Sequence, residues 1–523
     1  MTINSETFES FSTNPWGTHP SYKNSILSFS NSPEYAAPEV LLASLYRRIG
    51  LRRYDAGSEM DIPEGDVGKN GTQLAKVIDK HRKSGKQLGL LGVEGWGRVV
   101  DEVIRSPKQP NQRTRSAIQL TPIIPSCAAF SMAARLRGNP WNPGAYIESC
   151  VSLGEGSREK ALATWKELFK CLTVSDEDDD VWAVFLEKEI QRWSPIDLKW
   201  EFRGIKDTPT WMEEWRDPKA DYPAARFVTD LNHVLEAKHF LTRRQWTSVL
   251  ESCLRIGLGS HTLWVSKCNR ELFRICDDVL RGGEVPSATE IRSRLSTGEG
   301  FWSYEQPVGG QIKKLIREYI YGRIGLNLIL YRSVEIEALR ELATSLPFRS
   351  PERIRTFLLA LSGSLADFDY PKFVSAFDQA LETEPRKVSA KQGIGKNMEE
   401  FLRHSLGQRE THERGLESYD QGYLFGRRGS YSRAPWILSC GPVMTLTLTY
   451  CCSRDGTGVR TVKDLCNHLG EYGIRISPDE VSKSRLGLSL RTLGLVLDSP
   501  DAEGGMVIIN PFGSGQKQAK QVG

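Results

Sequence analysis

Between residues 224 and 418, apolar side chains recur at the spacing of an amphipathic helix, and this pattern constrains the fold more than any other feature. Apolar residues at i, i+3, i+4 and i+7 form one face of a helix. The segments that follow this spacing are FVTDLNHVLEAKHF, TRRQWTSVLESCLRIGL, GGQIKKLIREYIYGRIGLNLILY and PERIRTFLLALSGSLADF. Ser350 and Pro351 add a capping residue and a first-turn proline to the last of them. We therefore expect a helical middle domain.

The length of 523 residues allows several domains, each with its own core. A hydrophobic content of 39% and a charged content of 26% are ordinary for a globular protein. The net charge of +4 is too small to indicate a partner, so local charge must do so. We predict a mainly α, multi-domain protein.

Changes in composition indicate where the other domains begin and end. We expect an irregular N-terminal arm over 1–38, a basic and mostly helical domain over 39–174, an acidic, Trp- and Pro-rich connector over 175–223, a Gly-, Tyr- and Arg-rich linker over 419–433, a C-terminal module over 434–512 and a disordered tail over 513–523.

The C-terminal module has the pattern of three helices and a β-hairpin. The helices are predicted from APWILSCGPVMTLTLTYCC, from TVKDLCNHLGEYG and from a segment that begins at Ser477. Ser477 and Glu480 are spaced as a capping box. The third helix is expected to turn Val481, Leu488 and Leu493 toward the core. LGLVLD and MVIINPF then alternate as two strands.

This order of elements resembles the winged-helix domain. In that family the third helix commonly enters the major groove of DNA and the wing contacts the backbone, which implies contacts for Lys483, Arg485 and Arg491. Asp479 and Glu480 place negative charge where phosphates would lie. Many winged helices bind proteins only, so the resemblance implies either double-stranded DNA or a protein partner.

Two other basic segments are candidate nucleic-acid contacts. YRRIGLRRY is expected to place four arginines within two helical turns, and the linker GYLFGRRGSYSRAPW interleaves three arginines with aromatic residues. Arginines beside aromatic rings suit phosphate contacts with some base stacking. The candidate residues are Arg47, Arg48, Arg52, Arg53, Arg427, Arg428 and Arg433.

No catalytic, metal or cofactor motif meets its own requirements. EGDVGKNGT has Pro63 and Asn70 where a phosphate-binding loop needs glycine and Ser or Thr. Cys466 and His468 are two positions apart on a predicted helix, so they face different sides and do not suit zinc. The eight histidines have no obvious partner in the sequence. We expect no catalytic residues, no metal and no cofactor.

The ten cysteines follow no repeated spacing, which indicates free, mostly buried thiols in a reducing compartment. The first residues lack the basic and apolar regions of a secretory signal. No apolar run approaches the ~20 residues that a membrane span needs. We expect a cytoplasmic protein without membrane contact.

Three functions remain open. The favoured one is a non-enzymatic, nucleic-acid-associated or scaffolding subunit of a protein complex, similar in style to accessory components of bacterial antiviral defence or mobile-element systems. The second is a protein-binding adaptor without DNA contact. The third is a metal-dependent nuclease whose carboxylates converge only in the folded chain.

Overall fold

The structure, a computed structural model, is mainly helical. It describes residues 7–29, 31–36, 38–55, 58–61, 67–84, 92–106, 120–131, 141–205, 214–215, 222–298, 300–383, 392–409, 419–429, 434–456, 458–497 and 506–512.

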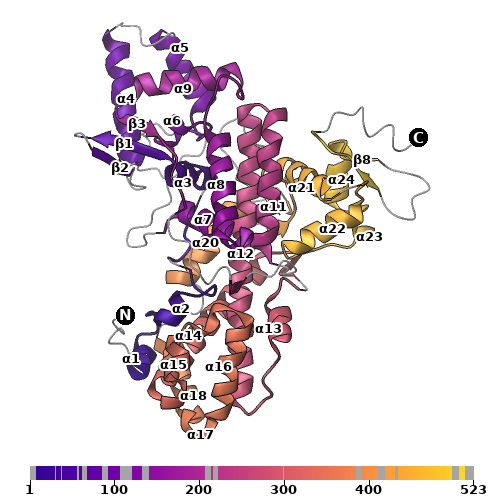
Figure 1. Ribbon diagram of the computed structural model, residues 1–523. Helices are drawn as coiled ribbons and strands as arrows, with labels where there is room; N and C mark the ends of the chain where they lie inside the picture. The colour runs from indigo at the N-terminus through magenta and orange to yellow at the C-terminus, as the bar shows by residue number, and fades with distance from the viewer. Residues whose placement is uncertain are drawn as a thin grey trace.

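Three helices connect the parts of the molecule: α11 (Pro223–Glu236) and the 38-residue α12 (Arg243–Leu280) lie in its middle, and the 27-residue α14 (Gly309–Glu335) packs against α12 in the lower part (Figure 1). The side chain of Thr242 accepts a hydrogen bond from Gln245 N–H in a capping box, which fixes where α12 begins. All four segments with helical spacing are helical, as expected.

The N-terminal group contains a small antiparallel sheet with the strand order β2-β1-β3. The strands are β1 (Leu51–Asp55), β2 (Ser58–Asp61) and β3 (Asp197–Trp200). Leu51 pairs with Trp200, so the connector supplies a strand to the preceding domain. The prediction of one helix over 46–54 is wrong, because the helix ends at Ile49 and the chain continues as β1.

Short helices surround this sheet and its connector. Their bounds are α3 (Pro38–Ile49), α4 (Val67–Ser84), α5 (Val93–Arg98), the π-helix η2 (Val99–Ile104), α6 (Pro125–Ala128), α7 (Pro143–Glu155), α8 (Arg158–Leu172) and α9 (Val181–Trp193).

The described part of the N-terminal arm is packed rather than irregular. It contains α1 (Phe8–Thr13) and α2 (Pro20–Lys23), which contact α14. The hydroxyl of Tyr22 donates to Asn269 Oδ1 on α12 at 2.6 Å. Burial of Phe8, Phe11 and Tyr22 explains why this polar segment is ordered.

The lower helices in Figure 1 complete the middle domain around α12 and α14. The side chain of Ser350 caps the helix that begins at Pro351, as expected, by accepting a hydrogen bond from the backbone N–H of Arg353. The elements are the 3-10 helix η4 (Ala237–Phe240), α13 (Ala288–Leu295), β4 (Trp302–Ser303), α15 (Glu337–Thr344), the 3-10 helix η5 (Pro347–Arg349), α16 (Pro351–Gly363), α17 (Leu365–Phe368), α18 (Tyr370–Thr383) and α20 (Gly393–Leu406).

The C-terminal part begins with two paired strands and continues as helices and a hairpin. Its elements are β5 (Phe425–Arg427), β6 (Trp436–Leu438), α21 (Pro442–Arg454), α22 (Val462–Glu471), β7 (Ile474–Arg475), α23 (Pro478–Val481), α24 (Arg485–Thr492), β8 (Val496–Leu497) and β9 (Val507–Ile508). β8 pairs antiparallel with β9, and Thr461 bridges to Val507. The first predicted helix is shorter than expected because its start is strand β6, and the third is split into α23 and α24.

The C-terminal module is attached to the middle domain at several points. β7 pairs in parallel with β4, and α21 packs against α12 and α11. In the preceding linker, Asp420 Oδ1 lies 2.8 Å from Arg255 Nη1 on α12, and both side chains are buried. The described part of this linker is therefore fixed against the middle domain.

All ten cysteines are buried free thiols, as expected. Among the described residues, no helix has the length and apolar character needed to cross a membrane.

Candidate functional site: a basic pocket beside the C-terminal module

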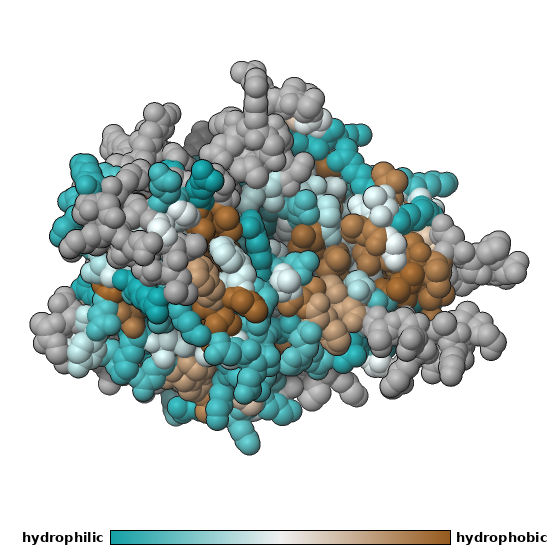
Figure 2. All heavy atoms as spheres, turned by 90° about the horizontal axis from the view of Figure 1, so that it is seen from above, coloured by the Kyte–Doolittle hydropathy of each residue, from teal (hydrophilic) through white to brown (hydrophobic). Residues whose placement is uncertain are grey.

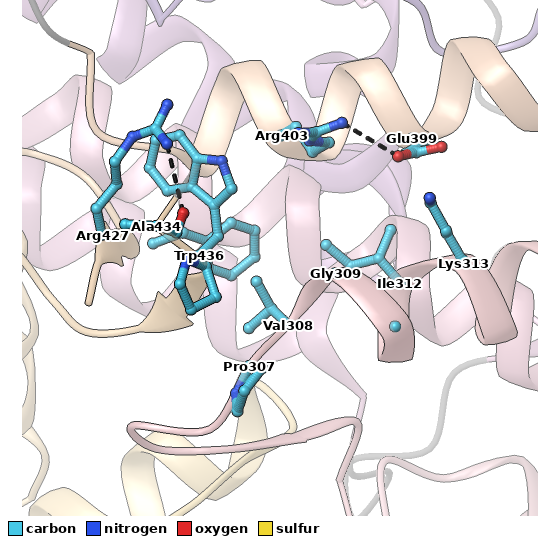
Figure 3. A pocket seen from close by; sticks show the side chains of 13 residues that line it. Pro307, Val308, Gly309, Ile312, Lys313, Glu399, Arg403, Arg427, Ala434 and Trp436 are labelled. Atoms are coloured by element: carbon cyan, nitrogen blue, oxygen red, sulfur yellow. Dashed lines mark hydrogen bonds and ion pairs between the residues drawn. The ribbon is translucent and has the colours of Figure 1, made fainter. Parts of the chain in front are cut away.

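A pocket of about 510 Å³ opens where the start of α14, α20 and the β5–β6 pair meet (Figure 3). Its apolar wall includes Ile312, Phe425 and Trp436. The remaining lining residues are Pro307, Val308, Gly309, Gly310, Lys313, Glu399, Arg403, Arg427, Ala434 and Pro435. The pocket thus joins segments that are far apart in the sequence.

Cationic side chains from three elements line this pocket. Arg403 Nη1 lies 3.3 Å from Glu399 Oε1. Arg427 donates to the Ala434 carbonyl oxygen at 3.4 Å, and its guanidinium lies 4.6 Å from the ring centroid of Trp436. Lys313 is exposed, and Figure 3 shows its amino group pointing toward Glu399. These groups can attract an anion, and Trp436 can contact an aromatic ring.

The structure brings one predicted contact of the third helix next to this pocket. Arg485 Nη1 lies 3.5 Å from the carbonyl oxygen of Arg427. The backbone N–H of Arg485 donates to Glu305 Oε1 at 2.6 Å, so a carboxylate of the middle domain already lies at the start of α24. Arg427 and Arg485 are therefore neighbours.

The other predicted residues of this region are placed as follows. Lys483 and Arg491 are exposed, and Arg491 donates to the Ser482 carbonyl oxygen at 3.2 Å. Arg428 is exposed, and its backbone N–H donates to Pro435 O at 3.1 Å. Arg433 lies outside the described residues.

Two of the four N-terminal arginines, Arg47 and Arg52, are structural, which corrects the role predicted for these two. Arg47 is buried and donates to the carbonyl oxygens of Ala128 and Ser131 at 3.0 Å. Arg52 is also buried and donates to its neighbours' carbonyl oxygens.

Arg48 forms an ion pair with Glu148, and Arg53 is half-buried on β1. Because Arg47 and Arg52 point into the interior, neither can contact a phosphate at the surface. We therefore leave these two out of the nucleic-acid contacts.

A second polar cluster lies between α11 and the C-terminal module, and sequence reasoning missed it. His468 on α22 lies between two carboxylates, with Nε2 2.9 Å from Asp230 Oδ2 and Nδ1 3.1 Å from Asp455 Oδ2. The hydroxyl of Tyr472 donates to Asp230 Oδ2 at 2.9 Å. Arg226 holds Asp455 through two hydrogen bonds of 2.9 Å and lies 2.6 Å from Asp230. No partner of His468 is evident in the sequence, because the fold brings Asp230 to it from a distant part of the chain.

The charges in this cluster compensate one another. Burial opposes the charge on His468, but attraction by Asp230 and hydrogen bonds to Asp230 and Asp455 outweigh it and raise its pKa to about 9. Burial likewise opposes the charge on Asp455, but His468 and Arg226 lower its pKa to about 2. The pKa of Asp230 is also lowered, against burial, by His468 and Arg226. The cluster is a buried network of ion pairs that joins two parts of the chain.

Asp230 also lies near two potential metal ligands. Single ligand atoms of Asp230, His233 and Cys451 lie within 4.8 Å of one another. Burial raises the pKa of the Cys451 thiol, which disfavours the thiolate that a metal would need. Arg226 and protonated His468 already compensate Asp230 and would repel a cation. We interpret the group as structural.

The chain matches no known protein family model, and no curated protein is significantly similar to it.

Proposed function

We propose that this protein is a non-enzymatic, nucleic-acid-binding subunit and that residues 434–512 form a winged-helix module. The order α21, α22 and α24 followed by the antiparallel hairpin β8–β9 supports the module. Thr461 ties the hairpin to the chain before α22. The helix α24 and the residues next to it expose Lys483, Arg485 and Arg491.

One observation carries the proposal: cationic side chains from separate elements converge on one open pocket. Lys313, Arg403 and Arg427 line it, and Arg485 of α24 contacts the backbone of Arg427. Phosphate contacts of lysine and arginine supply most of the affinity of proteins for nucleic acid. A strand that crosses from the pocket to α24 would meet them in succession.

The test is a titration of fluorescent duplex and single-stranded DNA at two salt concentrations. We expect affinity to fall steeply with salt, because binding releases counterions. Arg427→Ala and Arg485→Ala should each weaken binding several-fold and reduce the salt slope by about one. Arg355→Ala, an exposed change on α16, is the control and should bind as the unchanged protein does. No binding of either strand type at low salt would exclude the proposal.

A second candidate, a protein-binding adaptor, is favoured by exposed leucines on the same module. Leu488 is 65% exposed, Leu497 55% and Leu493 37%. Seen from above, hydrophobic side chains gather on the side of the molecule where the module lies (Figure 2). Such leucines suit a protein surface better than a phosphate backbone. This candidate predicts flat DNA titrations and loss of a stoichiometric partner on Leu488→Asp.

A further inference from the structure

The basic pocket has features that select one kind of ligand. Resting on the proposed function, we propose that it binds a nucleoside phosphomonoester, either free or at the end of a nucleic-acid strand. The phosphate would lie at the start of α14 beside Lys313 and Arg403, and the base would lie against Trp436.

The charge of the pocket matches a terminal phosphate. Among the described residues that line the pocket, Lys313, Arg403 and Arg427 are three cations and Glu399 is the one carboxylate, which leaves two excess positive charges. A terminal phosphomonoester carries about −1.5 to −2 charges at neutral pH. Each phosphate within a strand carries only one. A strand end therefore compensates the pocket better than the middle of a strand does.

The start of α14 adds backbone donors to these side chains. Its N-cap, Val308, provides no side-chain hydrogen bond, and the first N–H groups of a helix have no partner within it. Gly309 and Gly310 line the pocket, and a Cβ at either position would meet nothing within 4 Å. The backbone there is open to a ligand, and the helix dipole favours an anion.

The aromatic wall provides a place for the base. Trp436 is half-buried, with the guanidinium of Arg427 over its ring, and Figure 3 shows it between Arg427 and the labelled residues of α14 and α20. Stacking on an aromatic ring tolerates any base. The volume of about 510 Å³ lies in the range of small-ligand pockets and suits one nucleotide rather than a duplex.

Glu399 shapes the cationic side of the pocket. Its side chain is 7% exposed and lies 3.3 Å from Arg403 Nη1. This ion pair holds one end of the Arg403 guanidinium, which leaves its other N–H groups for a ligand. Removing Arg403 would leave the buried carboxylate of Glu399 without its ion-pair partner. Lys313 is exposed, so its replacement should not affect folding.

The experiment compares short single strands with a 5′-phosphate, a 3′-phosphate or hydroxyls at both ends, by fluorescence anisotropy of an internal label. One phosphorylated strand should bind about tenfold more tightly than the hydroxyl strand. Lys313→Ala should remove this difference, and Lys314→Ala, the neighbouring exposed lysine that does not line the pocket, should preserve it. Equal affinity for all three strands, with no binding of nucleoside monophosphates, would overturn the proposal.

Competition distinguishes the two sources of the ligand. If nucleoside monophosphates displace the phosphorylated strand, the pocket accepts free nucleotides; if they do not, it accepts strand ends only. Trp436→Leu should weaken nucleoside monophosphate binding and leave competition by inorganic phosphate unchanged. If all strands bind in a salt-dependent way and a terminal phosphate adds no affinity, the proposed function holds but the phosphomonoester site does not. If nucleoside monophosphates bind and Lys313→Ala abolishes that binding, but no strand binds, the phosphomonoester site holds and the proposed function does not.

Discussion

Nε2 of His468 lies 2.9 Å from Oδ2 of Asp230, and this contact joins the C-terminal module to α11. Both side chains are buried, and Arg226, Asp455 and Tyr472 complete the cluster around them. Glu471, 3.6 Å from Arg226, lies at its edge. The module is therefore held by charges as well as by apolar packing.

The first prediction concerns pH. The pKa of His468 is about 9 in the folded protein and 6.5 in its ordinary state. The stability that its charge contributes is fully present below pH 6.5 and is lost as the pH rises through about 9. We expect the free energy of unfolding, measured with urea, to fall across this window. His468→Gln should reduce this fall in the free energy of unfolding with pH, and exposed His239→Gln should not. An equal fall in the unchanged protein and in both variants would show that His468 does not cause it.

The second prediction concerns Arg226, whose side chain is 7% exposed. Arg226→Met should lower the free energy of unfolding by about 3–5 kcal/mol, because it leaves Asp230 and Asp455 with His468 as their one shared cation. Arg454→Met is the matched control. Arg454 on α21 pairs with Glu236 on α11, but both side chains are about half exposed. It should cost less than about 1 kcal/mol. Similar losses for both variants in urea denaturation would show that the network contributes little.

The third prediction concerns the contact between α12 and α14. A Cβ added to Gly322 would lie 2.4 Å from the carbonyl oxygen of Asn269, so the helices pack closely because this residue has no side chain. Gly322→Ala should lower the free energy of unfolding by about 1–3 kcal/mol. A Cβ on Gly363 of α16 would meet nothing within 4 Å. Gly363→Ala should therefore leave stability unchanged or raise it by up to about 1 kcal/mol, as thermal melting can show.

The fourth prediction concerns the face of α24 that turns inward. Leu490 is fully buried and Leu488 is 65% exposed. Leu490→Ala should therefore lower the free energy of unfolding by about 2–5 kcal/mol. Leu488→Ala should change it by less than about 0.5 kcal/mol. A large loss of stability for Leu488→Ala would show that this side chain is buried.

Helical spacing predicted the middle domain well, although it did not reach the end of the longest helix. The pattern covers the first half of α12 and stops before its second half, where Leu263, Trp264 and Val265 are buried together. A helix that is buried all round has no amphipathic period. Local spacing also misplaced Leu488 and Leu493, which are exposed. The third helix is split into α23 and α24, so one helical register from Ser477 does not hold.

The candidate site was harder to predict because its parts are distant in the sequence. The Arg-rich linker indicated Arg427, but nothing local to Lys313, Arg403 or Trp436 shows that they meet it. His468 and Asp230 are likewise 238 positions apart. The acidic residues of the predicted hairpin turn, Asp498, Asp501 and Glu503, lie outside the described residues.

The separation of Asp230 from His468 has a consequence for synthesis on the ribosome. At about 5–20 residues per second, the partners of Asp230 emerge on the order of ten to fifty seconds after it. During that interval α11 cannot bury its acidic side chain with a compensating imidazole. Until then Arg226, on the same helix, is the cation that can compensate Asp230. We therefore expect the middle domain to gain the last contacts of this cluster only after α22 has been made.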